Sequence, residues 1–231
     1  MAKATKNLTK RELKTPRAAA VAGIIFAVLS ITAQVLIRLS VPTDTSDTGA
    51  WLSGQASTVS LALSMVPFAG IAFLWFMGVV RDRLGHLEDQ FFSTVFFGSG
   101  LLYLSLTFVA AALAGSLLAD TSLQSSKAAG AITYSFGRLT MYQISNVYAL
   151  RMSGVFMISL GTIWLRTGTM PRWLAFITYA LALLLLVSIN LSVWFTLIFP
   201  AWVFVISMFI LVGNLRHQSA SASTERSPEP A

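Results

Sequence analysis

The stretch AAAVAGIIFAVLSITAQVLIRLS, residues 18–40, decides the fold class of this 231-residue chain. A helix needs about 20 apolar residues to cross the hydrocarbon core of a bilayer, and this stretch supplies them. Its apolar residues are continuous rather than alternating, which favours a helix over a strand of a barrel. Basic residues precede it, as in a signal peptide, but the run is too long and lacks a small-residue cleavage site. We therefore predict a retained first membrane helix.

Five further apolar stretches follow it along the chain. The sequence is 55% hydrophobic and 11% charged, with a mean hydropathy of +0.73, outside the range of soluble domains. We predict an all-α membrane protein, a bundle of six transmembrane helices over residues 18–216, between a basic N-terminal tail (1–17) and a disordered C-terminal tail (217–231). The spans are expected at about 18–40, 58–80, 91–118, 145–165, 173–190 and 193–215.

The basic residues predict the orientation of the bundle. Of the 16 Lys and Arg residues, twelve fall on one side of the predicted membrane: in the N-terminal tail, after the second span, between the fourth and fifth, and after the sixth. The positive-inside rule then puts both termini in the cytoplasm. The net charge of +7 is explained by this topology, because the basic residues flank apolar stretches instead of forming a nucleic-acid-binding face.

Arg151 is the most unusual residue within these stretches, none of which contains Asp or Glu. A guanidinium in hydrocarbon costs about 3 kcal/mol on insertion scales, so it usually faces a partner, a cavity or a ligand. Counting back about 20 residues from Arg166 puts the outer boundary of the span near Asn146. At 1.5 Å per residue, Arg151 then lies about 8 Å below that boundary. Its side chain can therefore reach the headgroups, or pair with Asp120 or an acid of the first loop.

A second interpretation makes Arg151 part of an outward-facing anion site. Guanidinium groups match the planar oxygens of carboxylate and phosphate. Arg138 and Arg38 are the other guanidinium groups expected in or near the outer half, and Tyr142 and Tyr148 are the aromatic candidates beside them. The sequence leaves both interpretations of Arg151 open.

The external segment at about 119–144 carries a helical pattern of its own. Five residues in and just after it fall three or four positions apart: Tyr134, Arg138, Met141, Tyr142 and Ser145. This spacing places them on one face of a helix. The fourth span is therefore also expected to begin early, as an interfacial or pore-lining helix.

Two prolines and three amides inside or near the spans have structural interpretations. Pro67 and Pro200 each remove a backbone hydrogen bond, and we expect a kink at each. Asn146 and Asn190 are expected to cap helix ends. Gln34 is embedded in the first span and is expected to hydrogen-bond to a neighbouring helix.

Small residues predict where helices pack closely. Gly98 and Gly100 lie in the third span, and Gly154 and Gly161 lie in the fourth. Because small side chains let helix backbones approach each other, we expect these two spans at the centre of the bundle. The leucine-rich fifth span is apolar nearly all round and is expected to face lipid.

The sequence contains few groups that could perform catalysis. It has no cysteine and only two histidines, His86 and His217, so no metal site and no cofactor are expected. His-Glu-x-x-His, Gly-x-Ser-x-Gly and Walker motifs are absent from it. His86 lies in the charged loop 81–90, where it is either a proton acceptor or part of a solvated turn. We predict that the protein is not an enzyme.

The junction Thr169-Met170-Pro171-Arg172-Trp173-Leu174, followed by a leucine-rich span, resembles small bacterial six-helix integral membrane proteins of a domain-of-unknown-function family. The resemblance covers most of residues 18–215 and implies the same six-helix layout. The motif also has a physical use, because proline begins a helix while arginine and tryptophan anchor the interface. The family has no established activity, so the resemblance assigns no functional residue.

Three function classes remain open at this point. The absence of catalytic and coupling groups favours a non-enzymatic accessory, scaffold or assembly partner in a bacterial plasma (inner) membrane, with both termini inside. The alternative is a transporter or binding protein for an anionic small molecule or lipid headgroup, using Arg151, Arg138 and Arg38. A membrane enzyme using Tyr, Ser or His86 is the third. The expected partners are the lipid bilayer, other membrane proteins or a second copy of the chain, and not nucleic acid.

Overall fold

Every element of the computed structural model is helical in the residues it describes, which are 15–41, 52–84, 90–120, 127–168, 170–187 and 193–224. This confirms the all-α prediction for those residues. The elements are α2 (Thr15–Ser40), α3 (Leu52–Leu84), α4 (Gln90–Asp120), α5 (Lys127–Gln143), the π-helical turn η1 (Ile144–Ala149), α6 (Leu150–Thr167), α7 (Arg172–Val187), the 3₁₀ turn η2 (Val193–Leu197) and α8 (Ile198–Thr224).

Five helices in this part of the chain are long and apolar enough to cross a membrane. They cover Ala18–Ser40, Gly54–Asp82, Phe91–Ala119, Ile132–Thr167 and Trp194–Gly213. The predicted span at 173–190 corresponds to α7, which has only 16 residues. At 1.5 Å per residue α7 is about 24 Å long, shorter than the roughly 30 Å hydrocarbon core. The predicted set of six therefore contains five helices of full length and one short helix.

The fourth helix is much longer than its predicted range of 145–165. Within the described residues α5, η1 and α6 follow one another without a break, and the apolar part alone, Ile132–Thr167, has 36 residues. The early start of this helix is confirmed, and the long external connector at 119–144 is wrong, because α4 continues to Asp120 and α5 begins at Lys127. The helical spacing before residue 145 is the physical reason.

The last helix also exceeds its predicted range. α8 continues to Thr224, beyond the expected end of the sixth span at 215. The first part of the predicted disordered tail is therefore helical, and residues 225–231 lie outside the described residues.

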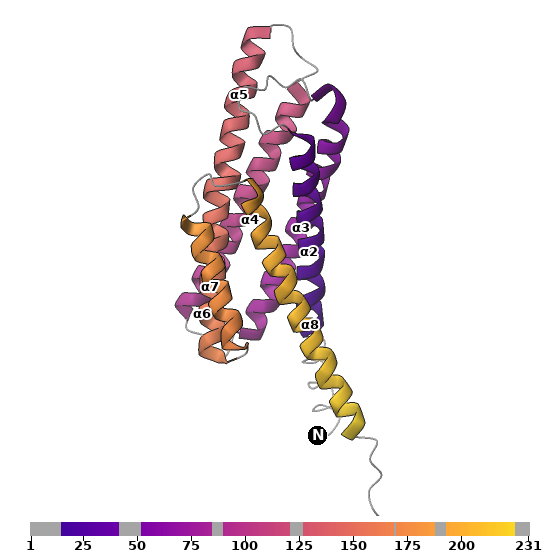
Figure 1. Ribbon diagram of the computed structural model, residues 1–231, viewed down its shortest axis with the longest axis vertical. Helices are drawn as coiled ribbons and strands as arrows, with labels where there is room; N and C mark the ends of the chain where they lie inside the picture. The colour runs from indigo at the N-terminus through magenta and orange to yellow at the C-terminus, as the bar shows by residue number, and fades with distance from the viewer. Residues whose placement is uncertain are drawn as a thin grey trace, which may run out of the picture.

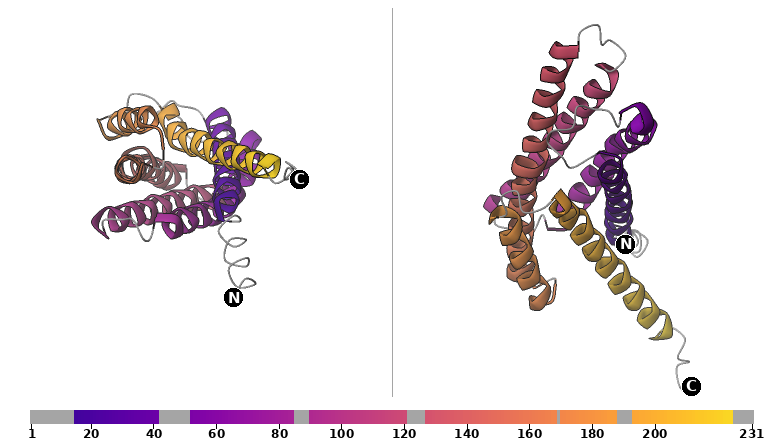
Figure 2. Two further views of the ribbon diagram at one scale, coloured as in Figure 1. Left: turned by 90° about the horizontal axis from the view of Figure 1, so that it is seen from below. Right: turned by 45° about the horizontal axis from the view of Figure 1, so that its top comes forward.

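The helices run alternately up and down the bundle (Figure 1). α2 packs against α3 and α8, α4 against α6, and α6 against α7. α7 and the start of α8 lie beside only the lower part of the long α4 and α5–η1–α6 helices, whose upper ends extend beyond them (Figures 1 and 2). Because neither α7 nor α8 reaches the upper part of the bundle, that part contains fewer helices.

One end of the bundle carries stacked arginines. α3 and α6 end there, and α4 begins there. α2 begins and α8 ends on the same side (Figure 1). Arg81 lies 4.8 Å from the ring centre of Phe97, and Arg166 lies 4.6 Å from that of Phe92. Both contacts are cation–π interactions that join the helix ends to the start of α4.

An aromatic cluster joins five helices at the middle of the bundle. We define it as Phe26 of α2, Phe73 of α3, Tyr103 of α4, Phe156 of α6 and Phe199 of α8. The ring of Phe73 lies 4.7, 5.6, 5.5 and 5.7 Å, centre to centre, from the other four in that order, and Phe73 has no exposed surface. Such aromatic pairs contribute about 0.5–1.5 kcal/mol each beyond their buried area.

Small residues bring α6 close to α7. A Cβ atom added at Gly154 would lie 3.1 Å from the carbonyl oxygen of Ala182, and one at Gly161 would lie 3.4 Å from Thr178. Gly100 packs between Met77 and Phe156, whereas Gly98 has open space around its Cα. Three of the four predicted packing glycines thus lie at helix contacts, and Gly98 does not.

The prolines and the α6–α7 turn follow local backbone rules. Pro67 lies inside α3. Pro200 is the third residue of α8, directly after the 3₁₀ turn η2, and the kink expected there stays a prediction. Gly168 ends α6 at φ 63°, a conformation that glycine adopts without strain. The carbonyl of Pro171 accepts a hydrogen bond of 3.0 Å from Leu174 N–H at the start of α7.

Replacing Gly154 with leucine is expected to destabilise the fold by about 1–3 kcal/mol, because the new side chain meets the backbone of α7. Gly98→Leu is the matched control, since it adds the same side chain to a helix surface with open space. Thermal unfolding in detergent, followed by tryptophan fluorescence, measures the two midpoints. Equal midpoints for the two variants would contradict the close packing of α6 on α7.

Candidate functional site

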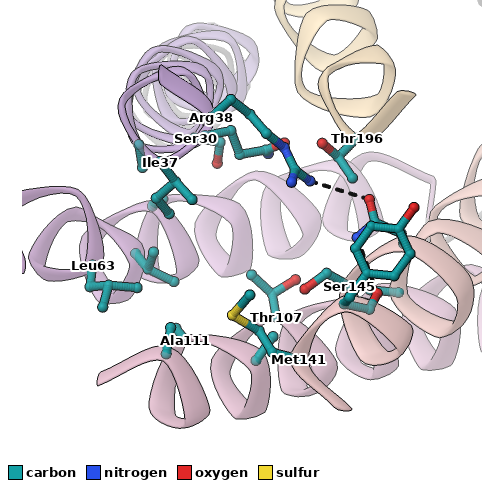
Figure 3. Close-up of a pocket in the computed structure, with 18 of the residues that line it drawn as sticks. Ser30, Ile37, Arg38, Leu63, Thr107, Ala111, Met141, Ser145 and Thr196 are labelled. Atoms are coloured by element: carbon teal, nitrogen blue, oxygen red, sulfur yellow. Dashed lines mark hydrogen bonds between the residues drawn. The ribbon is translucent and has the colours of Figure 1, made fainter. Parts of the chain in front are cut away.

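A partly open cavity of about 180 Å³ lies between α2, α3, α4 and α5–η1, next to the start of α8 (Figure 3). Three members of the aromatic cluster, Phe26, Tyr103 and Phe199, form part of its wall. Thr196 of η2 and Phe199 of α8 line it as well, so the cavity lies at the level where α8 begins. Several of the predicted functional residues line this cavity.

One wall of the cavity is almost wholly apolar. It is formed by α3 and α4, which contribute Val59, Leu63, Val66, Ala69, Gly70, Leu104, Ala110, Ala111, Ala114, Leu117 and Leu118. From Val59 to Gly70 this wall is about 17 Å long, at 1.5 Å per residue. A hydrocarbon group fits this wall because it leaves no polar group of the protein unpaired.

Most of the polar groups come from two helices on the other sides of the cavity, and Tyr103 and Thr107 of α4, Ser153 of α6 and Thr196 of η2 add further ones. α2 contributes Ser30, Gln34 and Arg38, and α5–η1 contributes Tyr134, Arg138, Tyr142, Ser145 and Asn146. Most of these residues are four positions apart, so each helix presents a polar stripe. Figure 3 shows Arg38, Ser145 and Thr196 on one side and Ile37, Leu63 and Ala111 on the other. The cavity is therefore amphipathic.

Arg38 is held across the cavity by a neutral side chain. Its Nη2 atom donates a hydrogen bond of 3.2 Å to Oδ1 of Asn146. The amide of Asn146 in turn donates a bond of 3.0 Å to the carbonyl of Tyr142, which orients it. Since an amide carries no charge, this contact positions the guanidinium without neutralising it. No Asp or Glu occurs among the described residues that line the cavity.

The position of Asn146 differs from the one expected. It was predicted to cap a helix end, but it lies in η1, inside a continuous helix. A π-helical turn is uncommon and occurs frequently at functional sites. Here it carries both Asn146 and Ser145 into the cavity wall.

Gln34 also differs from its prediction. It lines the cavity one helical turn from Arg38, but its Oε1 atom is buried and has no hydrogen-bond partner among the described residues. The side-chain oxygen of Gln34 therefore makes no interhelical hydrogen bond to the described residues. A buried carbonyl oxygen without a donor is unfavourable by about 1–3 kcal/mol.

The cavity contains some of the predicted anion-site residues and excludes others. Arg38, Arg138 and Tyr142 line it, whereas Arg151 and Tyr148 do not. Arg151 is the neighbour of the lining residue Leu150, and consecutive helical residues point about 100° apart. Tyr148 is 58% exposed on the bundle surface. The candidate site is thus centred on Arg38, and Arg151, which the anion-site hypothesis included, does not line it.

Several other predictions lie outside the described residues. These concern the side chain of Asp120, the acids of the first loop, His86, Asn190 and the side chain of His217. Where the structure describes side chains, no group of three His, Cys, Asp or Glu residues lies close enough to hold a metal ion.

Sequence reasoning assigned no ligand-binding role to Ser30, Gln34, Asn146 or Thr196, which all line the cavity. The four-residue spacing of Ser30, Gln34 and Arg38 was the available signal, because it places three polar groups on one face of an otherwise apolar helix. Thr196 had no such signal, since it lies in η2 and reaches the cavity only through the tertiary packing of that turn.

Comparisons with known proteins give no assignment: no protein-family model, curated protein or solved structure matches the chain. The resemblance to small bacterial six-helix membrane proteins at Pro171-Arg172-Trp173-Leu174 therefore stays a prediction.

A single cysteine at position 145 is expected to report a positive potential inside the cavity. The natural chain contains no cysteine, so Ser145→Cys adds a unique thiol to the cavity wall. A negatively charged methanethiosulfonate should react faster than a positively charged one, by about tenfold relative to a free thiol.

Two variants in the same background separate the sources of this preference. Arg38→Gln should reduce the preference for the negatively charged reagent. Arg151→Gln should leave this preference unchanged, because Arg38 lines the cavity and Arg151 does not. Faster reaction with the positively charged reagent would contradict a cationic cavity.

Proposed function

We propose that this protein is an integral membrane protein that binds an anionic amphiphile in the cavity between α2 and α5–η1, as a carrier or a receptor. The observation that carries the proposal is the guanidinium of Arg38, which faces the cavity and is held by the neutral Asn146. Arg138 adds a second cationic side chain to the same wall. The apolar wall of α3 and α4 accepts the hydrocarbon part of the same molecule.

The electrostatics favour an anion over other ligands. A charged group within the apolar part of a membrane protein is unfavourable unless it is compensated. A carboxylate or phosphate compensates a guanidinium with strong, paired hydrogen bonds. A cationic ligand would add like charge to a cavity that already contains Arg38 and Arg138.

The proposed setting is a bacterial plasma membrane with both termini in the cytoplasm. Five apolar helices of sufficient length support membrane insertion, and α7 completes the bundle as a short sixth membrane helix. The end of the bundle with Arg81 and Arg166 is then cytoplasmic by the positive-inside rule. In this proposed orientation the cavity, lined by Arg38 near the opposite end of α2, lies in the outer half of the membrane.

Binding is favoured here over a purely accessory or scaffold role because a built amphipathic cavity is a feature that a scaffold does not need. The accessory role and the absence of enzymatic activity stay predictions. Partners other than lipid, including a second copy of the chain, also stay predictions.

Decyl phosphate is expected to bind the purified protein in a neutral detergent, and decyl trimethylammonium of the same chain length is not. Arg38→Gln should weaken decyl phosphate binding about 10- to 100-fold, the loss of one charge-assisted hydrogen bond. Isothermal titration measures the affinities. Arg151→Gln is the matched control and should bind as the wild type does. Equal binding of the two amphiphiles would refute the proposal.

A negative charge introduced at position 146 tests the role of the uncompensated Arg38 guanidinium. Asn146→Asp is expected to weaken decyl phosphate binding about as much as Arg38→Gln, because the new carboxylate pairs with Arg38 and repels the anion. Asn146→Leu removes the bond without adding charge and should have a smaller effect. If Asn146→Asp bound decyl phosphate as tightly as the wild type, Arg38 would not be the anion-binding group.

A further inference from the structure

We propose that the ligand carries a hydroxyl group beside its anionic group, and that Gln34 recognises this hydroxyl. The inference rests on the proposed function and deepens it, since it names the chemical class of the ligand. That class is a hydroxylated phosphate or carboxylate with an apolar part.

The arrangement of α2 places the two recognition groups side by side. Gln34 and Arg38 are four residues apart and both line the cavity. Residues at this spacing have Cβ atoms about 5–6 Å apart on one helix face. An anion bound to Arg38 therefore brings atoms a few bonds away within reach of the Gln34 amide.

The unmet hydrogen bond of Gln34 determines what those atoms must be. Its Oε1 atom is buried with no partner among the described residues, so it gains from any ligand that supplies a donor. The last side-chain torsion of glutamine is soft, which lets the amide turn its oxygen toward the cavity. Because amide nitrogen donates and amide oxygen accepts, one Gln can make both kinds of bond to a hydroxyl.

Hydroxyl fits this position better than an ammonium donor. Arg38 and Arg138 line the same cavity, and a third cation beside them is repelled. A headgroup with phosphate and hydroxyl is thus favoured over one with phosphate and ammonium.

The size of the cavity limits how much of the ligand enters. Its volume is about 180 Å³, and an apolar cavity of about 150 Å³ in another protein holds benzene. There is room for a small headgroup and the first part of one chain along the α3–α4 wall, but not for two acyl chains. The same headgroup chemistry occurs in membrane lipids and in soluble metabolites.

Two matched pairs of probes distinguish these sources and test the hydroxyl. Phosphatidylglycerol and phosphatidylmethanol are anionic lipids that differ in the headgroup hydroxyls. Glycerol 3-phosphate and methyl phosphate are the corresponding soluble pair. Native mass spectrometry of the full-length protein measures lipid binding, and titration calorimetry measures the soluble pair.

The wild type is expected to prefer the hydroxylated member of at least one pair by about tenfold, the effect of one buried hydrogen bond. Gln34→Leu should abolish this preference. Gln34→Asn, which keeps the amide but shortens its reach, should reduce the preference and provides a second variant if the leucine variant does not fold. A preference confined to the lipid pair identifies a lipid ligand, and one confined to the soluble pair a metabolite.

Failure of this inference differs from failure of the proposed function. If both members of each pair bind equally, or if Gln34→Leu keeps the preference, the role of Gln34 is refuted while anion binding stands. If no anion binds in a manner that depends on Arg38, both proposals are refuted.

Discussion

The packing of four aromatic rings around Phe73 is the contact on which the rest of the bundle depends. Helices in a membrane gain little from burying apolar surface, because lipid is equally apolar, so close contacts determine how they associate. Phe26, Tyr103, Phe156 and Phe199 reach Phe73 from four different helices. This aromatic cluster determines the level at which α8 joins the bundle, because Phe199 is only the second residue of that helix.

The position of the cavity follows from the level at which α8 joins the bundle. Since α8 begins at the level of the aromatic cluster, the cavity between α2, α3, α4 and α5–η1 is lined by η2 and α8 only at their beginning. The polar stripes of α2 and α5–η1 face this space and are joined by the bond from Arg38 to Asn146. An asparagine at this position leaves the charge of the guanidinium uncompensated, whereas an aspartate would compensate it by forming an ion pair. An amphipathic site results from the aromatic packing, the level at which α8 begins and the polar stripes.

Part of the site was predictable from spacing, and the rest was not. The face formed by Tyr134, Arg138, Met141, Tyr142 and Ser145 could be read from the sequence, and all five line the cavity. Arg151 attracted the same hypothesis because of its charge, yet one helical position, about 100°, separates it from the lining residue Leu150. Asn146 was assigned a local role as a cap because the sequence pattern does not reveal a π-helical turn.

The sequence by itself determined the class of the protein, a set of long apolar helices of which five are long enough to cross a membrane. It could do so because the length and polarity of each stretch are properties of that stretch alone. Only the tertiary structure decided that Arg38 and Asn146 meet, that α7 is short and that a cavity separates α2 from α5–η1. The physical reason is that both lipid and the bundle interior are apolar, so hydrophobic patterning does not distinguish a helix face that meets lipid from one that meets another helix.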